Sequence, residues 1–220
     1  MWSSDYLIYF IDFIYDYYIM SKDVGILDPS GNNPNPLNGK PYSDKYKELA
    51  KKWANLPVYQ KRTEIIDSIK NNQVTLLIAQ TGSGKSVTAG QFALYATGFD
   101  KKIAFTLPKK IITQNLAEYV AEITDTTVGN EIGYKYKNSS KNAYNSETNK
   151  LLFATDGTIV SMLMKDPELK DFGAVIIDEA HERKVQIDFL LYLLRNTVKL
   201  RSDFKLIIMS ATIDSSIFKS

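Results

Sequence analysis

The sequence contains no cysteine, which excludes disulfide bonds and metal sites built on thiolates. It also lacks a strong excess of either charge, because 27 Lys and Arg stand against 25 Asp and Glu and give a formal net charge of +2. Any contact with nucleic acid would therefore depend on local basic clusters rather than on the field of the whole protein. The 220 residues, 44% of them hydrophobic, are enough for one sizeable domain plus an appendage.

The first apolar stretch, Tyr6–Met20, is too short and too acidic for a membrane span, and it lacks the basic region of a signal peptide. Asp5, Asp12 and Asp16 fall on one side of it at helical spacing, which predicts an amphipathic helix. We expect this helix to pack on the domain or on a neighbouring part that is missing. A helix on a membrane surface is the weaker alternative, because anionic lipid repels aspartate.

Proline, glycine and asparagine dominate residues 27–41, a composition typical of a linker, and we place a domain boundary there. Residues 1–41 are then an N-terminal helix with a linker, and residues 42–220 form the domain. Short apolar strands alternate with helices in this domain. We expect strands at 74–78, 102–107, 131–137, 151–154, 174–177 and 204–209, helices at 58–70, 87–94, 110–123 and 157–164, a helix centred on 189–195, and an exposed loop at 138–149. This order predicts a three-layer α/β fold with a mostly parallel sheet, covered on both faces, that binds ligands at the carboxyl ends of its strands.

A glycine-rich stretch from Ala79 to Ser86, Ala-Gln-Thr-Gly-Ser-Gly-Lys-Ser, lies between an expected strand and an expected helix. The backbone N–H groups of such a loop cradle phosphate oxygens. Lys85 can reach the β- and γ-phosphates of ATP, and the Ser86 hydroxyl can bind Mg²⁺. The usual pattern begins with glycine and here begins with Ala79, so we interpret this as a variant phosphate loop; a chance glycine-rich turn is the alternative that the flanking strand and helix disfavour. The expected nucleotide-binding residues are Thr81, Gly82, Ser83, Gly84, Lys85, Ser86 and Val87.

Two acidic residues, Asp178 and Glu179, end the buried strand Val175-Ile-Ile. In phosphate-loop enzymes an acidic residue at this place holds Mg²⁺ together with the loop hydroxyl, so Asp178 would share the metal with Ser86. Glu179 could orient or deprotonate the attacking water. His181, the only histidine, follows two residues later and could relay the state of Glu179. The alternative for the two acids is a solvated helix N-terminus, where anions are favoured.

The run Asp178-Glu-Ala-His181, followed by Glu182 and Arg183, resembles the signature of the DEAH-box helicases of superfamily 2, a group that includes spliceosomal and viral RNA helicases. Three further stretches are similar to motifs of that family and follow in its order: Thr106-Leu-Pro-Lys-Lys110, Thr155-Asp-Gly157 and Ser210-Ala-Thr212. The resemblance runs from about Leu56 to the end of the chain. It implies a RecA-like P-loop NTPase domain that uses ATP and Mg²⁺, with Glu179, Lys85 and His181 as catalytic residues.

The resemblance also implies roles for residues outside the nucleotide site. Ser210, Ala211 and Thr212 would couple hydrolysis to unwinding, and Tyr119 would stack on the adenine base where the family often has arginine. The expected contacts with nucleic acid are Thr106, Pro108, Lys109, Lys110, Lys137, Thr155, Asp156 and Gly157. Plainer alternatives stay open at this point: a solvated helix start for Lys109 and Lys110, an ordinary surface strand for Lys137, and a core position for Tyr119.

The family's motor needs two RecA-like domains, and the pattern of the second is not in this sequence. We therefore expect a second RecA-like domain as a partner, and weak ATP hydrolysis by the 220 residues alone. RNA is the expected substrate ahead of DNA. The alternatives are a superfamily 2 DNA helicase or translocase, and a nucleotide-gated binding module without motor activity. The expected location is intracellular, in cytoplasm or in a virion, because the composition hints at a large DNA virus.

Overall fold

A computed structural model describes residues 23–182 and 184–211, so the expected helix at Tyr6–Met20 and the coupling residue Thr212 lie outside the described part. One six-stranded sheet organises this part, with the strand order β1-β6-β5-β2-β4-β3. Every pairing in it is parallel. The strands are β1 (Val74–Ile78), β2 (Lys102–Leu107), β3 (Ile132–Lys135), β4 (Leu151–Thr155), β5 (Phe172–Ile177) and β6 (Lys205–Ser210). All six carboxyl ends therefore lie along one edge of the sheet.

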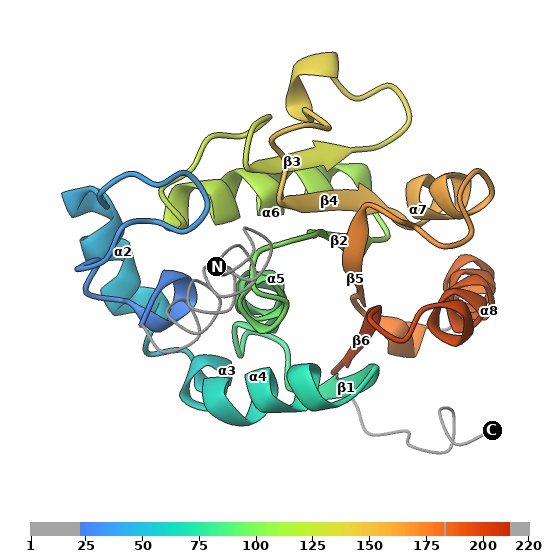
Figure 1. The fold of residues 1–220 in the computed structure, drawn as a ribbon, viewed down its shortest axis with the longest axis horizontal. Helices are drawn as coiled ribbons and strands as arrows, with labels where there is room; N and C mark the ends of the chain where they lie inside the picture. Colours follow the sequence, from blue (N-terminus) through green and yellow to red (C-terminus); the bar gives the residue numbers. More distant parts are fainter. Residues whose placement is uncertain (1–22, 183, 212–220) are drawn as a thin grey trace, which may run out of the picture.

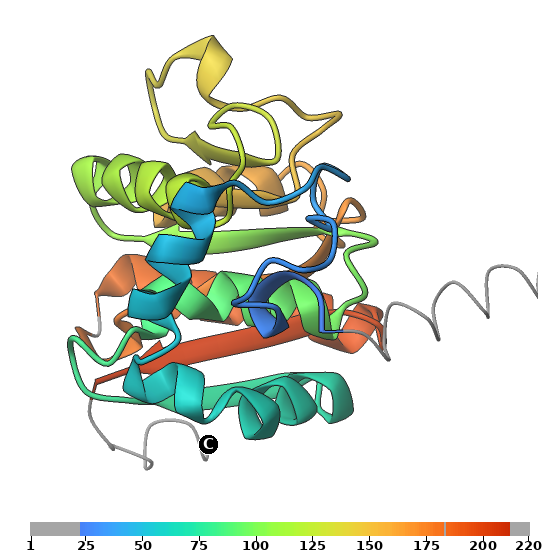
Figure 2. The ribbon, with the colours of Figure 1, turned by 90° about the vertical axis from the view of Figure 1, so that its left-hand side faces the viewer.

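Helices cover both faces of the sheet, because successive strand residues point to opposite sides (Figures 1 and 2). Ile103 and Phe105 pack with α5, α6 and the N-terminal helices, whereas Ala104 packs with α7 and α8. The helices are α2 (Asp44–Trp53), α3 (Pro57–Gln60), α4 (Arg62–Asn71), α5 (Lys85–Ala96), α6 (Lys110–Ile123), α7 (Asp156–Leu163) and α8 (Val185–Leu200), with 3-10 turns η1 (Gly25–Leu27), η2 (Lys141–Ala143) and η3 (Ala180–Glu182). The predicted three-layer α/β architecture is confirmed, and its sheet is wholly parallel among the described strands.

Three elements differ from the sequence prediction. The helix expected at 58–70 is split into α3 and α4, because Lys61 leaves the helical conformation and the Val58 N–H bonds to the Ser83 carbonyl of the glycine-rich loop at 3.1 Å. The strand expected at 131–137 is shorter, Ile132–Lys135. The loop expected to be exposed at 138–149 contains η2 and buries Asn149, whose amide donates to the carbonyl of Leu151 at 3.2 Å.

The segment rich in proline, glycine and asparagine packs on the domain. Ile26 is buried, and the Asn35 amide donates to the Thr124 carbonyl at the end of α6 at 2.8 Å. The Tyr46 hydroxyl donates to the Asp28 carbonyl at 2.9 Å. Residues 23–41 are thus fixed to α2 and α6; the division at residue 41 stays a prediction.

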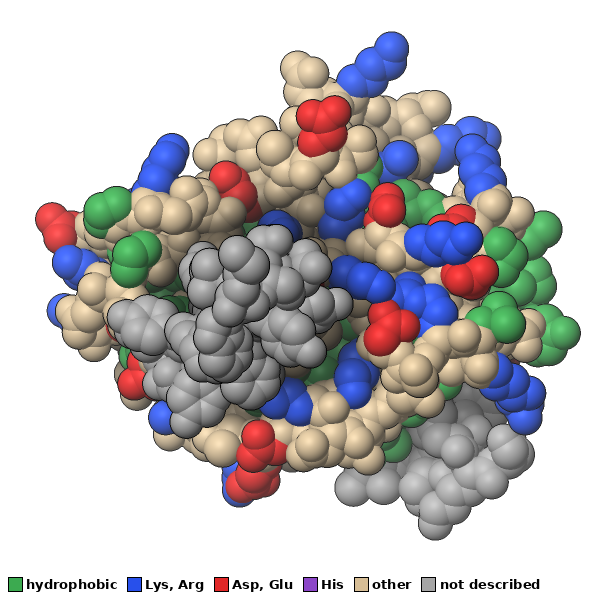
Figure 3. All heavy atoms as spheres, viewed as in Figure 1, with side chains coloured by type: hydrophobic (Ala, Val, Ile, Leu, Met, Phe, Trp, Pro, Cys, Tyr) green, Lys and Arg blue, Asp and Glu red, His purple; other side chains and the backbone are tan. Residues whose placement is uncertain are grey.

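Most large hydrophobic side chains lie inside, but Figure 3 shows several gathered at the right-hand edge of the molecule, over the positions of α7 and α8 in Figure 1. The exposed ones there include Met164, Val185, Phe189 and Tyr192. No helix in the described part of the chain is long and apolar enough to cross a membrane.

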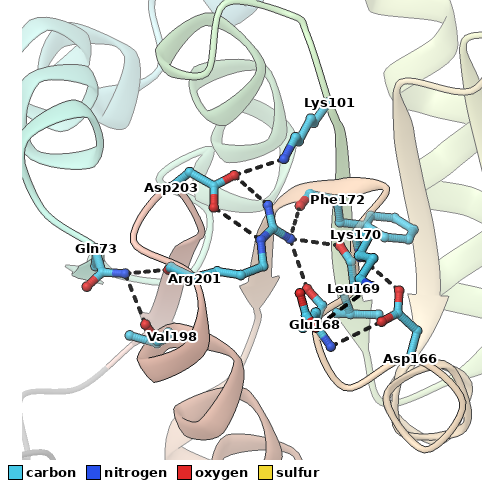
Figure 4. Close-up of polar contacts among 10 residues, drawn as sticks. All are labelled: Gln73, Lys101, Asp166, Glu168, Leu169, Lys170, Phe172, Val198, Arg201 and Asp203. Atoms are coloured by element: carbon cyan, nitrogen blue, oxygen red, sulfur yellow. Dashed lines mark hydrogen bonds and ion pairs between the residues drawn. The ribbon is translucent and has the colours of Figure 1, made fainter.

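Arg201 joins the loops at the amino ends of the strands (Figure 4). Its guanidinium donates to the carbonyls of Glu168, Leu169 and Phe172 at 2.8–2.9 Å. It also forms an ion pair with Asp203 at 2.6 Å. This network holds together the loops at the amino ends of the strands, at the edge of the sheet opposite the strands' carboxyl ends.

Candidate functional site

The loop between β1 and α5 is shaped by two glycines in the left-handed region. Gly82 has φ +82° and Gly84 has φ +93°, a conformation that other residues resist. A Cβ atom on Gly84 would also lie 2.6 Å from Leu56 Cδ1. The Ser83 hydroxyl is buried and has no hydrogen-bond partner in the structure. A buried polar atom without a partner fits a loop that receives an oxygen-rich ligand.

Lys85 begins α5 directly behind this loop, and its side chain is only 4% exposed. Its ammonium lies 3.7 Å from Oε1 of Glu179, which follows the carboxyl end of β5. A buried ammonium is costly unless anionic partners surround it, so the loop is prepared for a further anion. The helix N-terminus adds favourable partial charge at the same place.

Ser86 and Asp178 come together across the site, with the Ser86 hydroxyl donating to Asp178 Oδ2 at 2.6 Å. Burial raises the pKa of Asp178, and the hydrogen bond from Ser86 opposes that shift. A hydroxyl and a carboxylate are oxygen ligands suited to Mg²⁺, which takes few protein ligands and keeps waters and phosphates. The described residues contain no group of three or more acidic, histidine or cysteine side chains that could hold a metal without such help. The pair therefore fits Mg²⁺ that arrives with a nucleotide.

Glu179 and His181 form a connected chain of contacts. Glu179 has φ +53°, an unusual backbone shape for this residue type that sets the direction of its side chain. His181 Nε2 lies 3.3 Å from Glu179 Oε2, and the backbone N–H of Ala211 donates to His181 Nδ1 at 3.3 Å. Nδ1 therefore accepts and Nε2 carries the proton toward Glu179.

The strand β6 closes the same site. The Ala79 N–H at the start of the loop donates to the Ser210 carbonyl at 3.1 Å. With the Ala211–His181 bond, the end of β6 touches both the glycine-rich loop and the residues that follow β5. The structure thus brings together the loop, the Asp178–His181 run and Ser210-Ala211, as the sequence order led us to expect.

A separate groove of about 510 Å³ lies at the carboxyl ends of β3 and β4. Of the residues expected to contact nucleic acid, Lys110, Lys137, Thr155 and Gly157 line it. The sequence analysis missed its other members: Lys135, Tyr136, Thr158, Ser161, Met162 and Lys165. The positions in α7 and just after it recur at helical spacing, a signal that could have identified one polar helix face beside Gly157.

Two of the expected contacts have buried side chains. The Thr106 side chain is fully buried, because β2 lies in the middle of the sheet between β5 and β4, and Asp156 is also buried at the start of α7. Neither side chain lines the groove, and their contact with nucleic acid stays a prediction. Lys109 is exposed and Pro108 is half-buried just before α6, outside the lining of the groove. Tyr119 is 39% exposed on α6, which excludes the core position considered for it, and its stacking role stays a prediction.

The comparisons with known proteins agree on one family. The family model described as "DEAD/DEAH box helicase" matches residues 59–219. The chain is 46% identical over 194 residues to "Putative ATP-dependent RNA helicase L540" of Acanthamoeba polyphaga mimivirus, covering 87% of this chain and 28% of that protein. It is 40% identical over 165 residues to "ATP-dependent RNA helicase HrpA" of Borreliella burgdorferi, covering 74% of this chain and 20% of that protein. It is 36% identical over 197 residues to "Probable ATP-dependent RNA helicase DHR2" of Saccharomyces cerevisiae, covering 88% of this chain and 26% of that protein. The chain thus spans less than a third of the length of these relatives, and the comparisons confirm the resemblance drawn from the motifs.

Proposed function

Because the chain belongs to the DEAD/DEAH box helicase family, we propose that it is the first motor domain of an ATP-dependent RNA helicase of the DEAH type. One observation carries the proposal: a continuous chain of contacts runs from Lys85 through Glu179 and His181 to the backbone of Ala211. That chain joins the phosphate site to the end of β6. Through these contacts, a change at the phosphate site on hydrolysis can alter the position of Ala211, which does not itself bind phosphate.

The residues act in the following way. Lys85 and the loop N–H groups bind the phosphates, and Ser86 with Asp178 holds Mg²⁺. The metal, when bound, neutralises charge that develops on the phosphate oxygens. Glu179 accepts a proton from the attacking water, and its contacts with Lys85 and His181 hold its two carboxylate oxygens in place. Loss of the γ-phosphate changes the charge near Glu179, and His181 passes this change to Ala211.

The groove at β3 and β4 is the proposed nucleic-acid surface. Four lysines line it, namely Lys110, Lys135, Lys137 and Lys165, together with small hydrogen-bonding side chains. Such groups bind the sugar-phosphate backbone without reading the base sequence. The relatives' names support RNA as the substrate. Strand displacement on matched RNA and DNA duplexes tests that choice, and equal unwinding of both would contradict it.

A second RecA-like domain is the proposed partner, which completes the nucleotide site with an arginine finger. By NTPase precedent its absence lowers turnover by roughly 10³–10⁵-fold. We therefore expect the 220-residue chain to bind ATP and hydrolyse it slowly. Rapid hydrolysis that is unchanged when the remainder of the protein is added would contradict this part of the proposal.

The decisive variant is Glu179→Gln, which keeps the size of the side chain and removes the base. ATP binding should persist, while hydrolysis should fall by at least about 10²-fold, the usual contribution of a general base. Glu147→Gln, the same change on an exposed loop residue, is the matched control and should leave both unchanged. Full hydrolysis by Glu179→Gln would refute the assigned role, and a nucleotide-gated binding module would then be the better account.

A further inference from the structure

The short segment that leads from α2 into α3 contacts the glycine-rich loop at two places. The backbone N–H of Val58 donates to the Ser83 carbonyl at 3.1 Å. The Leu56 side chain fills the space beside Gly84, where an added Cβ would lie 2.6 Å from Leu56 Cδ1 and 2.9 Å from Leu56 Cβ. Leu56 and Val58 therefore hold two successive residues of the loop, and we call these two residues the brace.

The hydrogen bond from Val58 fixes the orientation of the peptide unit between Ser83 and Gly84. Such a unit is planar and trans, so its carbonyl and its N–H point in opposite directions. Because the carbonyl is turned toward Val58, the Gly84 N–H is directed away from α3. It lies directly before α5, which begins at Lys85 and whose first N–H groups have no partner within the helix. The bond thus adds the Gly84 N–H to the donors that can receive phosphate oxygens.

The contact with Leu56 restricts the most adaptable residue of the loop. Gly84 has φ +93°, and a glycine can leave that conformation at little cost. The half-buried Leu56 side chain packs against it and limits such movement. Within the loop, the Ser83 N–H donates to the Gln80 carbonyl at 3.2 Å, which closes a turn just before the braced residues. The shape of the loop therefore depends on a neighbour outside it.

The brace is itself anchored in the core of the domain. The Leu56 N–H donates to the Trp53 carbonyl at the end of α2 at 3.1 Å. Val58 and Tyr59 are buried, and the Tyr59 ring meets the Trp53 ring edge-on with 5.1 Å between the ring centroids. Pro57 occupies the first position of α3, where its fixed φ suits the helix and its missing N–H costs nothing. The brace is thus a rigid support.

We propose that Leu56 and Val58 are positioning residues, which hold the loop in its phosphate-binding shape before a nucleotide arrives. They act through Ser83 and Gly84, and both precede residue 59, where the match to the family model begins. The apparent affinity for a ligand falls in proportion to the fraction of protein in the binding shape. Loss of the brace therefore weakens nucleotide binding and leaves the chemistry of bound ATP intact. This inference rests on the proposed function, because it concerns the same nucleotide site.

Calorimetric titration of the 220-residue chain with Mg²⁺–ATP tests the proposal. Leu56→Ala should raise the Kd about tenfold, whereas Leu56→Met, which conserves the volume, should bind as the natural chain does. The control is Leu49→Ala, which removes the same atoms from a half-buried leucine of α2 that packs on the same core. It should lower the Tm and leave the Kd unchanged. At saturating ATP the hydrolysis rate of Leu56→Ala should stay within about twofold of the natural rate, while KM rises.

A double-mutant cycle tests whether Leu56 acts through Gly84. Because Leu56→Ala vacates the space that Gly84→Ala needs, the double variant should lose affinity by at least about threefold less than the product of the two single losses. Losses that simply multiply, or equal Kd values for Leu56→Ala and Leu49→Ala, would overturn the proposal. If thermal denaturation shows that Leu56→Ala does not fold, Leu56→Val repeats the test with a smaller truncation. A natural chain that fails to bind Mg²⁺–ATP would overturn the proposed function together with the brace, whereas tight binding by both the natural chain and Leu56→Ala would overturn the brace alone.

Discussion

Replacing Lys85 with methionine should separate stability from function. The Lys85 side chain is 4% exposed, and its ammonium lies 3.7 Å from Glu179 Oε1. At an effective dielectric constant of about 20, that pair is worth about 4–5 kcal/mol of attraction. Removing an ammonium from water costs several kcal/mol, and Glu179 remains 30% exposed, which weakens the attraction further. Because Glu179 is partly exposed and keeps His181 as a partner, water can solvate its carboxylate when the ammonium is lost. Lys85→Met should therefore change the stability of the nucleotide-free domain by no more than about 1 kcal/mol, below the cost of about 3–5 kcal/mol for a fully buried charge left unpaired.

The opposite result is expected when nucleotide is added. At a concentration of Mg²⁺–ATP about 100 times its Kd, the natural protein should gain about 2.7 kcal/mol. For a domain of this size that gain raises the Tm by about 5–11 °C. Lys85→Met should gain nothing, because it has lost the phosphate contact.

Thermal denaturation with and without Mg²⁺–ATP measures both effects. Lys52→Met, the same change at an exposed position of α2, should behave as the natural protein does. The reasoning fails if Lys85→Met loses more than about 2 kcal/mol without nucleotide, since that would make the lysine a structural residue. It also fails if the variant keeps the stabilisation by ATP.

Further predictions concern the loop, the groove and the framework. Gly84→Ala should weaken ATP binding and destabilise the domain by about 1–2 kcal/mol or more, because φ is +93° and the new methyl meets Leu56; unchanged nucleotide titration would contradict this. Lys165→Ala should lower the slope of log affinity for single-stranded RNA against log salt by about 0.7, measured by fluorescence anisotropy, and an unchanged slope would exclude this lysine from the groove contacts. Arg201→Met should lower the free energy of unfolding in urea by about 3–5 kcal/mol, because three carbonyls lose their donor. Asp203→Asn should lower it by about 1 kcal/mol or less, since that carboxylate is 54% exposed. Equal losses for the two variants would refute the ranking. Hydrogen bonds from Arg201 and then Lys101 lower the pKa of Asp203 in the folded protein. The stabilisation by this carboxylate is therefore present above the unfolded pKa of about 4 and is lost as the pH falls below it. Asp203→Asn should flatten the acid side of the plot of stability against pH.

The sequence predicted best where one local pattern determines the structure. Lys102–Leu107 and Lys110–Ile123 have the predicted bounds, because a buried apolar run ends at Pro108 and a helical period follows it. The glycine-rich loop was likewise predicted from one short stretch of the sequence. The burial of Thr106 could not be predicted from its motif, because only the strand order makes β2 an inner strand.

Contacts between distant elements were beyond the sequence. The groove combines residues of β3 and α7 with the residue that opens α6, so no window of sequence contains its four lysines. The bond from Ala211 to His181 likewise depends on how β6 lies beside β5. Neither could be derived from spacing alone, although the motif order indicated that such regions meet.

The central claim is that this domain hydrolyses ATP in response to RNA. The most direct measurement is the steady-state ATPase rate of the protein with both motor domains, with and without single-stranded RNA or DNA, beside Lys85→Ala. Our account predicts strong stimulation by RNA, weaker stimulation by DNA, and none in Lys85→Ala. An ATPase rate that neither nucleic acid changes, with nucleotide binding intact, would contradict the account.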